Sequence, residues 1–135
     1  MLRGIATLNF HATDMAAAEQ WYTDLLGVAP YFRRELEGSS AYLEWRLGDM
    51  ETEFGLIDAR FAPSTPETAG GAIAHWAVED VHAAYADLLD RGATSYQPPI
   101  ERGPGFITAS VVDPFGNILG VMKNTHYEEM YATND

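Results

Sequence analysis

The sequence predicts an α+β fold made of two tandem βαβββ modules, and three observations lead to this prediction. A strand-like segment followed by an aspartate-capped helix occurs twice along the 135 residues, once at Asp14 and again at Asp80. Three further strand-like segments follow each helix. A repeat of this size is typical of two copies of one supersecondary unit, neither of which covers its sheet alone.

The first copy begins with Ile5–Ala12, whose alternating character suits a half-buried strand. Asp14 is a helix N-cap, and apolar residues at helical spacing predict a helix over Met15–Leu26. Gly27 stands where a helix C-terminus favours glycine. Three strands are then expected around Val28–Arg34, Ala41–Leu47 and Glu53–Asp58.

The second copy follows the same plan. Ile73–Val78 is predicted as a strand, Asp80 caps a helix whose apolar face runs from Val81 to Leu89, and Gly92 ends that helix. Strands are expected at Ala93–Tyr96, Ile107–Val112 and Ile118–Met122. The last two are joined by Asp113–Asn117, where proline, glycine and asparagine favour a tight turn.

These elements predict a single domain over residues 1–124. Module one is expected at residues 1–60, a linker rich in proline and glycine at 61–71, and module two at 72–124. Residues 125–135 are expected to form a polar, loosely packed C-terminal tail.

Composition excludes several classes of function. Hydrophobic residues make up 47% of the chain, which is enough for a buried core. Twenty acidic against eight basic residues give a net charge of -12, which would repel nucleic acid. The absence of cysteine excludes disulfides and thiolate metal ligands. Apolar runs are short and no signal-peptide pattern precedes the first strand, so we expect no membrane partner and a cytoplasmic location.

Three segments of the second copy resemble a known family. GAIAHWAVEDV (71–81), LLDRGA (88–93) and VDPFGNILG (112–120) are similar to the vicinal oxygen chelate superfamily, which includes glyoxalases, bleomycin-resistance proteins and extradiol dioxygenases. Asp14, Trp21–Tyr22 and Leu25–Gly27 match its first-half signature, and the look-alikes belong to an uncharacterised glyoxalase-like subgroup. The resemblance covers residues 3–124. It implies two modules whose sheets form a curled mixed sheet around a shared cavity, and a homodimer.

Catalytic members of this superfamily hold a divalent metal with His, Gln or Glu from four strands. The resemblance places the ligand positions at Thr7, Gly55, Ile73 and Gly120. Glycine and isoleucine have no donor atom, and threonine is a poor ligand for the metals involved. The usual metal site is therefore expected to be absent, and no cofactor is expected.

Strand alternation then predicts which residues line the cavity. Asn9 and His11 share the face of Thr7, His75 shares the face of Ile73, and Glu53 shares the face of Gly55. Trp45 is a further candidate for stacking on a ligand, although the sequence does not fix its side of the strand. Leu8, Phe10, Trp76 and Val78 are expected to face the helices.

These residues favour a metal-free protein that binds a small amphipathic molecule, and the candidate ligands include a cationic one. The alternative is a lyase, isomerase or dioxygenase of glyoxalase type with a displaced metal held by His11, Glu53 and His75. A His–Glu pair is also able to perform acid–base chemistry without a metal. A third possibility is an interaction domain whose cavity is vestigial. No residue is assigned a catalytic role.

Overall fold

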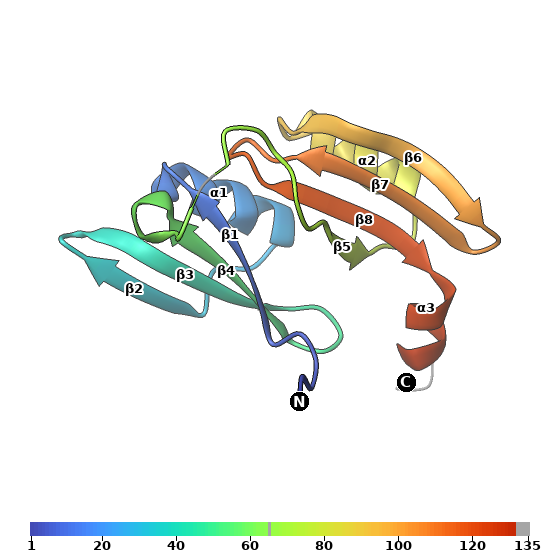
Figure 1. Cartoon of the computed structure of the whole chain (residues 1–135), viewed down its shortest axis with the longest axis horizontal. Helices are drawn as coiled ribbons and strands as arrows, with labels where there is room; N and C mark the ends of the chain where they lie inside the picture. Colours follow the sequence, from blue (N-terminus) through green and yellow to red (C-terminus); the bar gives the residue numbers. More distant parts are fainter. Residues whose placement is uncertain (65, 132–135) are drawn as a thin grey trace. The chain divides into compact units, whose positions relative to one another are not determined.

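The computed structural model describes residues 1–64 and 66–131, which divide into two units at Thr65/Pro66. Each unit holds a four-stranded mixed sheet and a helix in the order βαβββ (Figure 1). The α+β class and the tandem modules are therefore confirmed. The elements of the first unit are β1 (Thr7–Ala12), α1 (Met15–Leu26), β2 (Phe32–Leu36), β3 (Ser39–Leu47), β4 (Thr52–Asp58) and the 3-10 turn η1 (Ala59–Phe61).

The first sheet has the strand order β1-β4-β3-β2, with β1 parallel to β4 and the other neighbours antiparallel. Helix α1 packs on β3 and β4. Alternation turns Leu43 and Trp45 of β3 toward this helix, where they meet Phe10, Tyr22 and Phe54 in an aromatic core. The other face of the sheet carries Tyr42, Glu44 and Glu53.

The second unit repeats this arrangement. Its sheet has the order β5-β8-β7-β6, and α2 packs on β6, β7 and β8 (Figure 1). Val111, Leu119 and Val121 are buried, on the face that alternation turns toward α2. The elements are β5 (Ala74–Ala77), α2 (Val81–Asp90), β6 (Thr94–Gly103), β7 (Phe106–Val112), β8 (Ile118–Asn124) and α3 (Thr125–Tyr131).

Both helices begin as their sequences predict. The Asp14 carboxylate accepts a hydrogen bond from the Ala17 amide at 3.0 Å, and Asp80 accepts one from Ala83 at 3.0 Å. Gly27 ends α1 with a φ of 73°, the left-handed conformation that glycine adopts without a steric penalty.

The turn between β7 and β8 is built around Asp113. This carboxylate is buried and accepts hydrogen bonds from the Phe115 and Asn117 amides at 2.9 and 2.8 Å, and from the Asn117 side chain at 3.0 Å. Side-chain acceptance of backbone amides fixes the turn without help from distant residues.

Two expected strand boundaries are corrected, and the expected tail contains a helix. The strand expected at Val28–Arg34 begins only at Phe32, because Pro30 has no amide to donate and Val28 instead uses its carbonyl to accept from the Trp45 indole at 2.9 Å. The strand expected at Ala93–Tyr96 continues to Gly103, since an edge strand with bulges tolerates prolines. The expected tail forms α3 over Thr125–Tyr131, with no buried residue, and residues 132–135 lie outside the described part.

Among the described residues, no helix has the length and apolar character that crossing a bilayer requires.

Candidate functional site

The candidate site lies on the face of the first sheet that α1 does not cover. Along β3, alternation places Tyr42, Glu44 and Arg46 on this face, while Leu43 and Trp45 turn to the helix. Glu53 of β4 is paired with Arg46 across the sheet. We call the set Tyr31, Tyr42, Glu44, Arg46 and Glu53 the Tyr–Glu cluster.

Glu44 is the centre of this cluster. Its carboxylate accepts a hydrogen bond from the Tyr42 hydroxyl at 2.6 Å and a second, short one from the Tyr31 hydroxyl. Tyr31 precedes β2, whereas Tyr42 and Glu44 belong to β3. The backbone bond from the Tyr31 amide to the Glu44 carbonyl, at 2.9 Å, brings Tyr31 to this place.

Glu53 connects the tyrosines of the cluster with Arg46, the positively charged residue of the set. It accepts from the Thr7 hydroxyl at 3.1 Å and from the Tyr31 hydroxyl at 3.4 Å. The Arg46 guanidinium lies 3.8 Å from the Glu53 carboxylate and 4.3 Å from the centre of the Tyr31 ring. This is a cation–π contact combined with an ion pair, at a half-exposed position.

Both phenols of the cluster have raised pKa values. The hydrogen bond to Glu44 is the main cause for Tyr31, and burial is the main cause for Tyr42, followed by its hydrogen bond to Glu44. A proton shared with a carboxylate is harder to remove, because the phenolate would face a second negative charge. The two tyrosines are therefore hydrogen-bond donors at neutral pH and not bases.

The floor of the site contains Gly55, which pairs with Asn9 on one side and Glu44 on the other. A Cβ atom at Gly55 would collide with the Asn9 amide oxygen and lie 2.6 Å from the Tyr42 hydroxyl oxygen. These two polar groups, 3.5 Å apart, occupy the space that a longer side chain at position 55 would need. Glycine here is what allows Asn9 and Tyr42 to meet.

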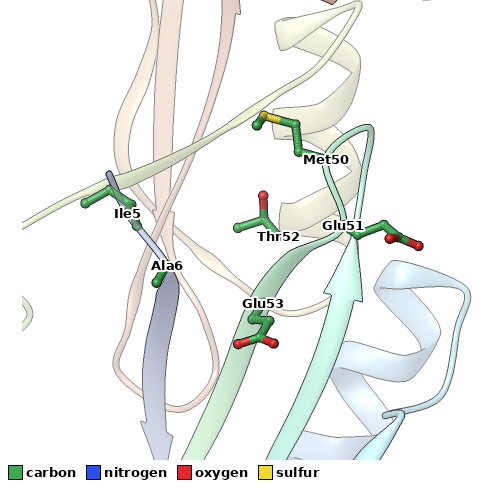
Figure 2. A pocket seen from close by; sticks show the side chains of 6 residues that line it. All are labelled: Ile5, Ala6, Met50, Glu51, Thr52 and Glu53. Atoms are coloured by element: carbon green, nitrogen blue, oxygen red, sulfur yellow. The ribbon is translucent and has the colours of Figure 1, made fainter. Parts of the chain in front are cut away.

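An open depression of about 370 Å³ adjoins the site at the start of β4 (Figure 2). Glu53 belongs both to its lining and to the Tyr–Glu cluster. The remaining lining residues are Ile5 and Ala6 ahead of β1, Met50 and Glu51 from the β3–β4 turn, and Thr52 at the start of β4. A mixed apolar and acidic depression next to the cluster suits an amphipathic ligand.

The predicted residues are placed as follows. Asn9 and Glu53 are brought to one face of the first sheet, as expected from alternation. His11 lies on the same strand, beyond Asn9, and pairs with Ile57. His75 belongs to the second unit, where it is exposed and pairs with Gly120.

The structure corrects the expectation for Trp45. Its side chain is 1% exposed, contacts Tyr22 and Phe54 in the core, and donates its indole N–H to the Val28 carbonyl at 2.9 Å. No face of the ring is free to stack on a ligand, because the strand turns this residue toward α1. The aromatic residues of the site are instead Tyr31 and Tyr42.

Sequence reasoning missed Tyr31, Tyr42, Glu44 and Arg46. The alternation of Tyr42, Glu44 and Arg46 with buried residues along β3 was a usable signal for one polar strand face. No local pattern indicates Tyr31, because the position of its hydroxyl beside Glu44 depends on the conformation of the segment between α1 and β2.

Comparison with known proteins identifies the family. The family model described as Glyoxalase/Bleomycin resistance protein/Dioxygenase superfamily matches residues 4–121. The chain therefore belongs to this superfamily. No protein of curated function is significantly similar to it.

Solved structures of the family share the fold at low identity. A superfamily member from Sphaerobacter thermophilus is 20% identical, with a TM-score of 0.71 over 91% of this chain and 98% of that one. A glyoxalase-related enzyme from Fulvimarina pelagi is 17% identical, with a TM-score of 0.69 over 92% and 90%. A glyoxalase/bleomycin resistance protein from Catenulispora acidiphila is 23% identical, with a TM-score of 0.59 over 87% and 96%.

The residues at the superfamily's metal positions do not fit a metal. Thr7 uses its hydroxyl to donate to Glu53, and Gly55 has no donor and no space for one. In the second unit Ile73 has no donor, and a Cβ at Gly120 would lie 2.7 Å from the His75 ring. Within residues 1–64 and 66–131, no three His, Asp or Glu side chains gather into a metal-binding group.

Proposed function

We propose that this protein binds a small amphipathic molecule without a metal, through the Tyr–Glu cluster, and that the ligand carries a positive charge on an aromatic body. The observation that carries the proposal is the combination of a carboxylate pair, Glu44 and Glu53, with tyrosine side chains on one sheet face. Cations bind favourably against aromatic rings and beside carboxylates.

The position of Arg46 supports this ligand class. Its guanidinium lies over the Tyr31 ring and beside Glu53, so the chain supplies a planar cation of its own at this place. Two carboxylates against one guanidinium leave a formal negative charge in the cluster. The net charge of -12 adds a field that attracts cations.

The raised pKa values of Tyr31 and Tyr42 argue against general-base catalysis by these phenols. A phenol that stays protonated at neutral pH donates hydrogen bonds but does not abstract protons. The cluster thus offers two carboxylates and tyrosine rings to a cationic ligand, while both phenol protons are already donated to Glu44.

The test is a pair of probes that differ mainly in charge: 1-naphthylmethylammonium and 1-naphthoate. We expect isothermal calorimetry to show saturable binding of the cation and none of the anion. Glu44→Gln is expected to weaken cation binding by at least about tenfold, because a charged hydrogen-bond partner contributes roughly 1.5–3 kcal/mol.

Asp90→Asn is the matched control, since it removes one carboxylate from an exposed position at the end of α2. It should leave the affinity unchanged at moderate salt. Equal binding of cation and anion, or an equal loss in both variants, would refute a specific cation site in the cluster.

A further inference from the structure

The place over the Tyr31 ring is already occupied by a cation of the chain itself. The Arg46 Cζ atom lies 4.3 Å from the centre of that ring, and its Nη2 atom lies 3.8 Å from the Glu53 carboxylate. Arg46 and Glu53 are direct partners across β3 and β4, so strand pairing keeps the arginine stem at this position. A cationic ligand that uses the Tyr31 ring and Glu53 must therefore compete with Arg46.

The Arg46 side chain is able to leave this place. It is 54% exposed, and its separation of 3.8 Å from Glu53 is longer than a hydrogen bond. Exposed ion pairs and exposed cation–π contacts are weak, because water screens the charges. Exposed side chains also change rotamer within nanoseconds. The guanidinium is thus held weakly and reversibly.

The Tyr31 ring, in contrast, is held by several bonds. Its hydroxyl donates to the Glu44 carboxylate, and its amide donates to the Glu44 carbonyl at 2.9 Å. Hydrogen bonds to a carboxylate are stronger than those between neutral groups. When a ligand approaches, the ring therefore keeps its position and the guanidinium moves.

The charges of the cluster favour competition over a role of Arg46 in holding a ligand. The other ionised groups of the cluster are the carboxylates Glu44 and Glu53. An anionic group bound to Arg46 would lie beside these two like charges. A cation that displaces Arg46 gains the same carboxylates as partners.

We infer that Arg46 is a specificity-determining residue whose guanidinium occupies the cation position over Tyr31 and beside Glu53, and that a cationic ligand binds by displacing it. This inference rests on the proposed cation binding by the Tyr–Glu cluster. Only a cation that binds there better than the tethered guanidinium is retained. An aromatic cation also contacts the adjoining depression, whose lining does not include Arg46, and this added contact allows it to replace the guanidinium (Figure 2).

The test compares the parent chain with Arg46→Gln, which keeps part of the stem and removes the charge. Calorimetry measures the affinity of each for 1-naphthylmethylammonium in about 0.15 M salt. We expect Arg46→Gln to bind at least about threefold more tightly, since an exposed ion pair and an exposed cation–π contact no longer have to be broken. A smaller gain, no gain or weaker binding would overturn the inference.

Arg60→Gln is the matched control. Arg60 makes the same kinds of contact at the other end of β4, an ion pair with Asp58 at 3.0 Å and a cation–π contact with Phe61 at 5.1 Å. Asp58 lies roughly 17 Å along the strand from Glu53, beyond the screening length of about 8 Å. Arg60→Gln changes the net charge equally and should leave the affinity unchanged. An equal gain in both variants would mean that net charge is responsible, which overturns the inference.

NMR follows the displacement directly. In the free chain, we expect nuclear Overhauser effects between the Arg46 side-chain protons and the Tyr31 ring protons. These effects should disappear when the parent is saturated with the naphthyl cation. Their absence from the free chain, or their persistence at saturation, would contradict displacement.

Failure of the proposed function and failure of this inference give different results. If neither the parent nor Arg46→Gln binds the naphthyl cation, both are refuted. If the parent binds it and Arg46→Gln binds no more tightly, the cation site stands and only the competition by Arg46 is refuted.

Discussion

At Glu44, one carboxylate accepts hydrogen bonds from two tyrosines that come from different segments of the chain. This residue holds Tyr31 against β3 and sets the charge of the cluster. Its effect on the Tyr31 pKa gives a direct test of the geometry. Replacing the carboxylate with a neutral amide removes the main cause that raises this pKa.

Glu44→Gln is therefore predicted to lower the Tyr31 pKa toward its ordinary value near 10. The Tyr42 pKa should fall less, because burial is its main cause and remains in the variant. Titration of the tyrosine Cζ signals by ¹³C NMR measures both. An unchanged Tyr31 pKa would mean that the two groups are not bonded in solution.

A substitution at Gly55, in the floor of the site, gives a second test of the same cluster. Gly55→Ala places a methyl group against Asn9 and Tyr42, and we expect it to displace both side chains and weaken naphthyl cation binding several-fold. Gly70→Ala is the control, because nothing lies within 4 Å of a Cβ there. Calorimetry measures both variants. Equal affinity of Gly55→Ala and the parent would show that Tyr42 does not take part in binding.

At the scale of elements, the helix starts follow from local signals. Asp80→Ala removes the cap of α2 and should destabilise the chain by about 1 kcal/mol in urea unfolding. Asp87→Asn on the same helix breaks only an exposed pair with Arg91, so less than about 0.5 kcal/mol is expected. A smaller loss for Asp80→Ala than for Asp87→Asn would contradict the capping role.

The end of β4 is pH-sensitive through Asp58. Hydrogen bonds from the Arg60 side chain lower the Asp58 pKa, and its carboxylate also caps η1 through the Arg60 amide at 2.9 Å. A lowered folded-state pKa stabilises the protein above the ordinary aspartate pKa, and the stabilisation is lost as pH falls through the lowered value. Asp58→Asn should thus be less stable than the parent at pH 7, with the difference disappearing in acid. A difference independent of pH would exclude the ion pair as its cause.

The helices, strands and turns also show why some elements could be predicted from the sequence and others could not. Caps, helical spacing and the Asp113 turn depend on residues within a few positions, so the sequence alone locates α1, α2 and the β7–β8 turn. The limits of β2 and β6 depend on the partner strand and its bulges, which no local pattern reveals. Alternation placed Asn9 and Glu53 correctly, but the side of Trp45 depends on the register of β3, and the place of Tyr31 depends on a loop.

For the whole molecule, the fold of the superfamily is combined with residues at the expected metal positions that are poorly suited to hold a metal. Gly55 and Gly120 correspond in the two units, and in each unit a neighbouring side chain from the paired strand covers the glycine. The two sheets nevertheless differ in character. The face of the first that α1 does not cover carries carboxylates and phenols, whereas the corresponding face of the second carries His75, Ser110 and Thr108, with the Arg102 side chain donating to Thr108 at 3.2 Å, so similar backbones present different chemistry.

The central claim is ligand binding that does not require a metal. The most direct measurement is calorimetry of 1-naphthylmethylammonium with the full chain after dialysis against EDTA, repeated with added Zn²⁺ or Ni²⁺, with the metal content of each sample determined. We predict the same dissociation constant in all samples and no stoichiometric metal retained after purification without chelator. Binding that appears only when the metal is restored, together with about one metal ion per chain, would contradict the claim.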